Sequence, residues 1–164
     1  MRNYISQPRT LGTALRHLLE LLDGDVQAIY REQGLDYRPR YTPIMRALSK
    51  GQPIAIRDLA VAAGITHSAA SQTVAKMKRA GLVEQVSGVD GRERAVKLTR
   101  RGRASLPKLE VRWVATNAAA QALDRELSKR LTECVEEAIA ALEARPFRDR
   151  VREREGRLAR RSMK

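Results

Sequence analysis

Apolar residues recur at every third or fourth position near the start of the chain, which is the spacing of one face of a helix. The residues on this face are Leu11, Leu15, Leu18, Leu19, Leu22, Val26, Ile29 and Tyr30. Thr10 can cap the first turn, and Gly34 can end the last one. The pattern therefore predicts one long amphipathic helix between these two residues.

Prolines divide the next part of the chain into shorter elements. Pro39 and Pro43 punctuate the segment that follows the long helix, because proline and the residue before it resist helical geometry. We expect a short helix over residues 44–49 and a brief strand over residues 53–55.

Two closely spaced helices come next. The first covers residues 56–63 and is closed by Gly64, and the second covers residues 66–80 and stops at Gly81. Two helices joined by Gly-Ile-Thr have the spacing of a helix-turn-helix.

A hairpin is predicted after the second of these helices. Residues 82–86 and 94–98 alternate as strands do, and a glycine-rich loop separates them. Thr99 is placed to cap a further helix.

From residue 100 the pattern is helical almost to residue 144, and Pro107 is expected to kink or interrupt the first part. The apolar stripes of these helices and of the first helix exceed what a small domain can cover, so we expect a second copy of the chain to bury them. Residues 145–164 have alternating charge and few apolar residues, which fits either a solvated helix or a disordered tail.

These elements predict a mainly α fold with a small β-wing, in which a winged helix-turn-helix domain is joined to a long-helix dimerisation region. The composition agrees, because 43% of residues are hydrophobic but only 4% are aromatic, and alanine and leucine favour helix over sheet. We assign residues 1–40 to an N-terminal helix that contributes to dimerisation, 41–100 to the DNA-binding domain, 101–144 to C-terminal dimerisation helices and 145–164 to a basic tail.

The net charge of +13 attracts polyanions. It is concentrated in two places. Residues 41–103 carry twelve basic and four acidic groups, and residues 145–164 carry nine basic and three acidic groups. Nucleic acid is therefore the first partner to consider, and an anionic membrane is the second. For the tail, a solvated extension and an additional phosphate-binding arm both remain open.

Other classes of function find little support in the sequence. The lone cysteine, Cys134, excludes an intrachain disulfide and fits a reducing cytosol. It falls between Leu131 and Val135 in an apolar stripe, where we expect a buried, unreactive thiol. We predict no catalytic residues, metal, cofactor or membrane span, and a cytoplasmic protein.

The second helix of the predicted helix-turn-helix has a polar face suited to DNA. If its apolar residues face the core, small and polar residues lie on the opposite side. The candidates for DNA contact on this face are His67, Ser68, Ser71, Gln72, Lys76 and Arg79. Gln72 can pair with both N6 and N7 of adenine, and Lys76 and the hydroxyls can hold phosphates. The alternative is an amphipathic helix whose polar face is merely solvated.

From residue 47 to residue 104 the sequence resembles the MarR family of bacterial regulators. The matching positions are Leu59, Ala60 and Gly64 in the helix-turn-helix, Gly81, Leu82 and Val83 at the exit into the wing, Asp90 and Arg92 at the wing tip, and Leu98, Thr99 and Gly102 where the wing closes. The flanking long helices are similar to the dimerisation arrangement of that family. The resemblance thus extends over roughly residues 10–144 and implies a repressor that binds DNA as a dimer.

The wing tip is the second candidate DNA contact. Asp90 and Arg92 are two residues apart in a tight loop, so the carboxylate can bond loop amides or steady the guanidinium. A restrained arginine suits a narrow minor groove. The resemblance implies this role for Arg92, with Arg94 and Lys97 nearer the backbone. An ordinary hairpin turn with solvated charges is the alternative.

The resemblance also implies release from DNA by a small molecule. Tyr30, Tyr41 and Trp113, with Tyr37, could line an effector pocket between the dimer helices and the wing domain, or they could simply be core residues. We therefore expect a sequence-specific regulator, a repressor that binds a pseudo-palindromic operator in double-stranded DNA as a homodimer, with a small-molecule effector. The competing interpretation is a non-specific nucleic-acid-binding or chromosome-architecture protein, for which charge alone would set the affinity.

Overall fold

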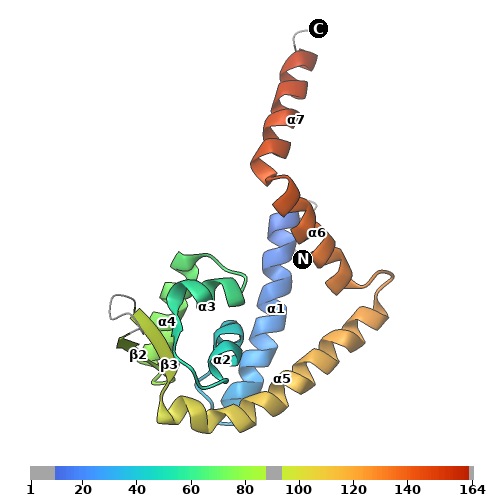
Figure 1. The fold of residues 1–164 in the computed structure, drawn as a ribbon. Helices are drawn as coiled ribbons and strands as arrows, with labels where there is room; N and C mark the ends of the chain where they lie inside the picture. The colour runs from blue at the N-terminus through green and yellow to red at the C-terminus, as the bar shows by residue number, and fades with distance from the viewer. Residues whose placement is uncertain (1–9, 88–93, 163–164) are drawn as a thin grey trace, which may run out of the picture. The chain divides into compact units, whose positions relative to one another are not determined.

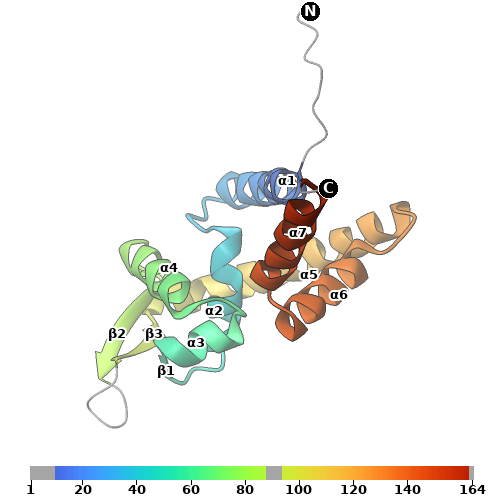
Figure 2. The same ribbon diagram turned by 90° about the horizontal axis from the view of Figure 1, so that it is seen from above.

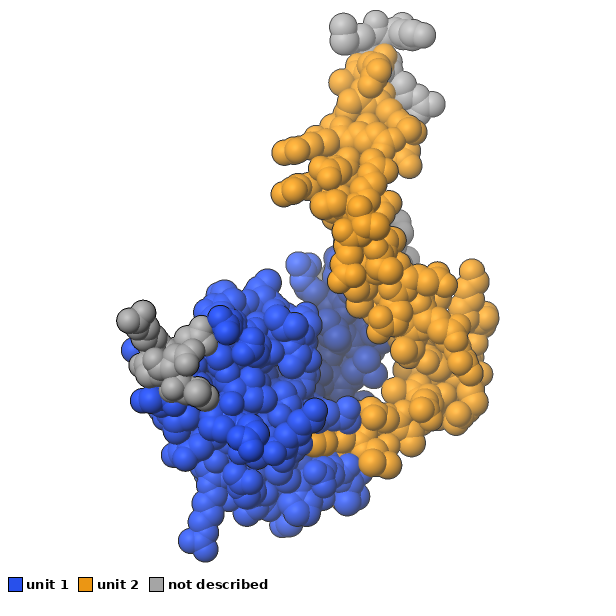
Figure 3. Space-filling model, viewed as in Figure 1, with its two compact units in different colours: residues 1–111 blue, residues 112–164 orange. Residues whose placement is uncertain are grey.

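A computed structural model describes residues 10–87 and 94–162 of the chain (Figures 1 and 2). Most of these residues are helical, and the described strands make a small antiparallel sheet. The predicted mainly α fold with a β-wing is therefore confirmed. The chain divides into two compact units, residues 1–111 and 112–164, which Figure 3 distinguishes by colour. Within the described part, no helix has the length and apolar composition needed to cross a membrane.

The long first helix, α1 (Leu11–Glu32), begins and ends where the sequence predicts. The hydroxyl oxygen of Thr10 accepts a hydrogen bond from the backbone N–H of Thr13, which satisfies a donor that the helix leaves unpaired. At the other end, Gly34 has a φ of +67°, a conformation that glycine adopts without steric cost.

A 3-10 turn, η1 (Pro39–Tyr41), leads into α2 (Thr42–Leu48). The predicted start of α2 at residue 44 is two residues late. Pro43 lies in the first turn of this helix, where the missing N–H of proline would have had no partner in any case.

The predicted helix-turn-helix is present as α3 (Ile56–Ala62) and α4 (His67–Arg79). Between them Gly64 has a φ of +62°, so the chain can reverse within a few residues. The hydroxyl of Thr66 then accepts a hydrogen bond from the N–H of Ala69 and caps α4. These turn residues set where the exposed face of α4 points.

The wing is an antiparallel sheet with the order β1 (Ile54–Ala55), β3 (Arg94–Leu98), β2 (Val83–Ser87). Val96 in the central strand pairs with residues of both neighbours. The predicted first strand of the hairpin starts one residue early, because the N–H of Leu82 is used to close α4.

The core of the first unit lies where α2, α3 and α4 meet the sheet and the start of the following helix. Its fully buried apolar side chains include Ile44, Met45, Leu48, Leu59, Ala70, Met77, Val96 and Leu109. Burying side chains of this size contributes about 1.5–3 kcal/mol each, so this core holds α4 in a fixed orientation.

A tight joint connects the helix-turn-helix to the long helix α5 (Arg100–Glu126). The hydroxyl of Thr99 donates to the carbonyl of Gly81 at 2.6 Å, and the N–H of Thr99 donates to the carbonyl of Leu82 at 3.1 Å. The N–H of Gly102 in turn donates to the hydroxyl oxygen of Thr99 at 3.0 Å. A Cβ atom on Gly102 would lie 2.0 Å from the carbonyl oxygen of Leu82, so only glycine fits.

The helices after residue 100 are separated at a different place from the one that the sequence suggests. Pro107 lies inside α5 without interrupting it, because the rest of the 27-residue helix provides enough backbone hydrogen bonds to tolerate the loss of one. The break comes later instead, since α5 ends at Glu126 and α6 (Leu131–Ala144) begins five residues further on.

The break before α6 has a specific cause in Asp124. Its carboxylate accepts hydrogen bonds from the N–H groups of Leu131 and Thr132 and from the hydroxyl of Thr132, at 2.9, 3.2 and 2.6 Å. These bonds, that of the hydroxyl above all, hold the pKa of Asp124 below its usual value. A side chain seven residues upstream thus caps α6.

The tail forms a further helix, α7 (Phe147–Ser162). Of the two alternatives for this segment, the structure supports the solvated helix.

The joint at Gly102 leads to a stability prediction. Gly102→Ala should lower the free energy of unfolding by about 3 kcal/mol, the upper end of the range for overpacking, because the added methyl group meets backbone. Thermal or denaturant unfolding of the full chain measures this loss. Gly156→Ala is the control, because its Cβ would meet only the end of Arg160 at 3.9 Å and alanine favours helix by up to about 1 kcal/mol. Equal stability of Gly102→Ala and the wild type would refute the role of the joint.

Candidate nucleic-acid interface

The helix α4 has one buried face and one polar face. Ala70, Val74 and Met77 are buried, as the sequence predicts. On the other side, the residues predicted to contact DNA are all accessible, with Lys76 half-buried and the others exposed; they are His67, Ser68, Ser71, Gln72, Lys76 and Arg79. The structure therefore brings these six side chains to one surface.

The first two turns of this face carry small, uncharged side chains beside His67, and the last two turns carry cations. Ser68, Ser71 and Gln72 occupy the first two turns, whereas Lys76 and Arg79 lie in the last two. Short side chains let a helix approach the floor of the major groove closely, and an amide can donate and accept at one adenine. The cations at the far end are placed to meet a phosphate strand.

A hollow of about 370 Å³ adjoins the start of α4. Besides Ala55 and Ile56, its lining consists of His67 and Ser71 from α4, Arg57 from α3, Gln85 from β2 and Arg94 from β3. Two arginines, a histidine, a hydroxyl and an amide thus converge on one open space. Such a set of donors suits the phosphates of a nucleic-acid backbone.

Two of these residues, Arg57 and Gln85, were missed by the sequence reasoning. Gln85 could have been found from the strand pairing. Ser87 pairs with Arg94, and residues two apart in a strand lie on the same face of the sheet, so Gln85 shares the face of Ser87 and Arg94. Arg57 gives no such signal, since only the packing of α3 against α4 and the sheet brings it to the hollow. Its guanidinium also lies 3.4 Å from the carboxylate of Asp58, which orients it at the start of α3.

The two basic residues of β3, Arg94 and Lys97, differ in how much positive charge they bring to this surface. Arg94 at the start of β3 is exposed and lines the hollow. The ammonium of Lys97 instead lies 3.3 Å from the carboxylate of Glu84 on the neighbouring strand, so part of its charge is neutralised within the protein. Asp90 and Arg92, predicted for the wing tip, lie outside the described residues.

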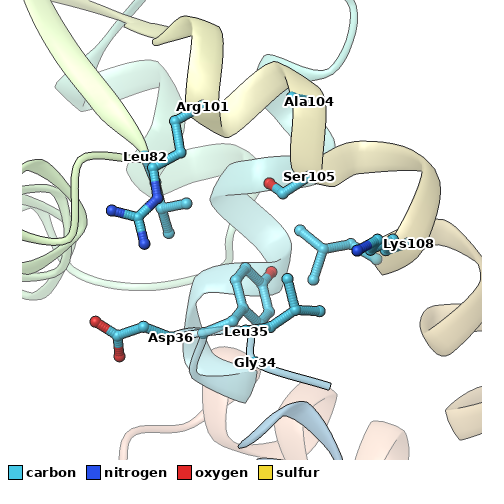
Figure 4. Close-up of a pocket in the computed structure, with 10 residues that line it drawn as sticks. Gly34, Leu35, Asp36, Leu82, Arg101, Ala104, Ser105 and Lys108 are labelled. Atoms are coloured by element: carbon cyan, nitrogen blue, oxygen red, sulfur yellow. The ribbon is translucent and has the colours of Figure 1, made fainter.

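A second cavity, of about 220 Å³, lies in the same unit near the start of α5 (Figure 4). Arg101, Ser105 and Lys108 reach it from α5, and Leu35 and Asp36 reach it from the segment between α1 and η1. The remaining lining residues are Gly34, Tyr37, Leu82, Ala104 and Leu109. Apolar walls with two cations, one carboxylate and the hydroxyls of Ser105 and Tyr37 can accept a small molecule that carries an anionic group.

The aromatic residues suggested for an effector pocket are core residues in the structure. Tyr30, Tyr41 and Trp113 are all buried, and none of them lines the cavity of Figure 4. Tyr37, which does line it, packs edge-on against both Tyr30 and Tyr41, with ring centroids 4.8 and 5.7 Å apart. The two buried tyrosines therefore support the wall of the cavity from behind.

The expectation that Cys134 is buried is wrong for the single chain, in which Cys134 is exposed. The sequence placed it in an apolar stripe of α6. The structure describes the whole of this helix, and none of its residues is buried. The stripe is real as a pattern, but the described residues of the chain leave it unburied.

Comparisons with known proteins bear on the winged helix-turn-helix domain as a whole. The MarR family model matches residues 34–93. A comparison with curated proteins finds no match.

Among solved structures, a MarR family transcriptional regulator from Silicibacter pomeroyi is 25% identical, with a TM-score of 0.57, over 80% of this chain and 94% of that one. The Mycobacterium tuberculosis regulator MOSR in complex with DNA is 22% identical, with a TM-score of 0.65, over 83% and 98%. The Streptomyces coelicolor regulator PcaV in complex with its natural ligand is 20% identical, with a TM-score of 0.55, over 85% and 99%. Residues 34–93 thus match the MarR family model, and the chain is similar in fold to solved MarR-family transcriptional regulators.

Proposed function

We propose that this protein is a sequence-specific transcriptional repressor that binds a pseudo-palindromic operator as a homodimer and is released by a small-molecule effector. The observation that carries the proposal is the exposed polar face of α4 beside the hollow lined by Arg57 and Arg94. One surface thereby combines groups that read bases with groups that hold phosphates. A regulator of defined sites needs both.

The roles within this surface follow from side-chain chemistry. Gln72 can form paired hydrogen bonds with one adenine, which discriminates against a wrong base by about 1–3 kcal/mol. Arg57 and Arg94, which line one hollow beside the start of the reading helix, would contact phosphates there. They would add affinity for any sequence and fix the register of the helix in the groove. Arg92 would extend these contacts into the adjacent minor groove.

Dimerisation is supported by apolar surface that the chain leaves open. In α1 this surface includes Leu11, which is 71% exposed, together with Leu15, Leu19, Leu22 and Ile29. In α6 it includes Val135, Ile139 and Leu142. Contiguous apolar stripes on soluble proteins mark interaction surfaces. A second copy would cover them symmetrically and place two α4 helices on successive half-sites.

An effector site is supported by the cavity of Figure 4. At about 220 Å³ it lies below the roughly 300–1,000 Å³ of pockets for drug-sized ligands, so its ligand would be small. Arg101 and Leu82, which line it, flank the joint between α4 and α5. A ligand that drew Arg101 or Lys108 toward itself would act on the element that orients α4. That the protein represses transcription, rather than activating it, is proposed from its resemblance to the family.

The DNA-reading role predicts a contrast between two substitutions. Selection of bound sequences from a random duplex library should enrich an inverted repeat with half-sites about ten base pairs apart. Gln72→Ala should relax the preference at one position of each half-site. Arg94→Ala should instead weaken binding to every sequence, by on the order of 1–3 kcal/mol, without changing the preference.

Enrichment of no sequence, despite tight and salt-sensitive binding, would contradict the proposal and favour the chromosome-architecture alternative. An unchanged selected motif with Gln72→Ala would remove Gln72 from base reading.

The exposed stripes predict a dimer at micromolar concentration. Light scattering should give a particle of about twice the 18.4 kDa of one chain. Leu15→Glu with Leu19→Glu should shift the particle toward the monomer, because charge on the apolar face of α1 opposes its burial. Lys129→Glu, on an exposed position outside the stripes, is the control. A wild-type mass of one chain would reject the dimer.

The cavity predicts a ligand class. In a screen of small carboxylic acids by thermal unfolding, a ligand should raise Tm, and at 100 times its Kd it should add about 2.7 kcal/mol of stability. The same compound should lower the affinity for the selected duplex. Lys108→Ala should abolish both effects, whereas Lys129→Ala should keep them. A compound that still acts on the Lys108→Ala variant binds elsewhere.

A further inference from the structure

The helix α7 has a composition that the proposed function does not use. Its 16 residues contain seven arginines, three acidic residues and no lysine. Arginine presents a planar fork of donors that matches phosphate oxygens, and it keeps its charge at all accessible pH values. A net charge of +4 on one short helix is therefore a surface suited to a polyanion.

Side chains fix α7 to the end of α6. The guanidinium of Arg145 pairs with the carboxylate of Glu153, and Arg157 binds the same carboxylate from the other side. Arg150 donates a hydrogen bond to the carbonyl of Ala141 in α6 at 2.8 Å. The bond from Arg145 and the charges of Arg157 and Arg145 lower the pKa of Glu153. The corner between the two helices is thus held by two arginines, Arg145 and Arg150, and α7 is a directed arm of the second unit.

Other arginines of α7 remain turned toward solvent. An open hollow of about 680 Å³ is lined by Arg154, Arg157 and Arg160 together with Leu158. Arg154 and Arg160 are exposed and form no ion pair with Glu153 among the salt bridges of the described residues, although the charge of Arg154 acts on Glu153 and the Nε–H of Arg160 donates to the carbonyl of Gly156 at 3.2 Å. Three guanidinium groups around one open space form a site for oxygen anions, because each can offer paired N–H donors.

We propose that α7 is a second DNA contact, in which Arg154 and Arg160 bind backbone phosphates of the duplex outside the half-site read by α4. The inference rests on the proposed DNA-binding function, which supplies the polyanion. Charge complementarity favours DNA over a second copy of this helix, because two helices of charge +4 repel each other. Once α4 is bound, tethering raises the local concentration of duplex near α7, so a modest contact becomes effective.

The test compares two double variants of equal charge change in the full chain. R154Q/R160Q removes the two solvent-facing arginines and leaves Arg145, Glu153 and Arg157 intact. R125Q/K129Q is the control, because both residues are exposed in the same unit but lie outside α7. Binding is measured over a range of salt concentrations to two duplexes. The first is the inverted repeat selected by the wild type, and the second is the same repeat with about ten unrelated base pairs added at each end. The length of each added segment exceeds the roughly 24 Å length of α7.

On the extended duplex, R154Q/R160Q should weaken binding roughly tenfold and reduce the slope of log K against log salt by about one for each arginine in each chain. On the short duplex it should bind as the wild type does, and the control should match the wild type on both. An unchanged slope on the extended duplex would overturn the proposal. A shift of R154Q/R160Q to a smaller particle in light scattering would also overturn it, since α7 would then join copies of the chain. Failure of the proposed function itself would appear separately, as a wild type that selects no sequence.

Discussion

The hydrogen bonds of Thr99 at the joint between α4, the wing and α5 are the constraint on which the DNA-binding surface depends. Thr99, which follows the last strand, bonds both to the turn after α4, at Gly81 and Leu82, and to the first turn of α5, at Gly102. Gly102 lets the two backbones approach to a distance that no side chain would allow. Because α4 is tied at this end and capped by Thr66 at the other, its polar face has a defined direction relative to the wing.

This joint explains why so much of the first unit could be predicted from sequence. The sequence signals for the helix-turn-helix and for the joint are local. They are Gly64 and Gly81 at positive φ, Thr66 as a helix cap and Thr99 before a helix. Each acts within a few residues, so its meaning does not depend on the rest of the fold. The exposed face of α4 follows from helical periodicity once the core side is known, which is why the predicted contact residues of this helix lie on one surface.

Features built from distant residues could not be predicted in the same way. Asp124 ends one helix and caps the next across seven residues, and the intervening sequence contains no glycine or proline to indicate a break. Arg57 reaches the hollow only through tertiary packing. The tyrosines were ambiguous because an aromatic residue can line a cavity or support it, and here Tyr37 does the first while Tyr30 and Tyr41 do the second. Cys134 lies in an apolar stripe that the sequence pattern shows, but a pattern does not say what covers a residue, and in the single chain Cys134 is exposed.

Under the proposed function, the distribution of charge would separate the specificity for DNA sequence from the affinity for DNA. The first two turns of α4 carry serines and a glutamine, which can distinguish bases but contribute little electrostatic attraction. The cations lie around this face, at Arg57, Arg79 and Arg94, and again in α7. Since phosphate contacts dominate affinity and weaken with salt, this arrangement makes binding strength adjustable at the periphery without altering the bases that are read. Loss of a peripheral arginine should therefore change how tightly every site is held, while the choice among sites stays with α4.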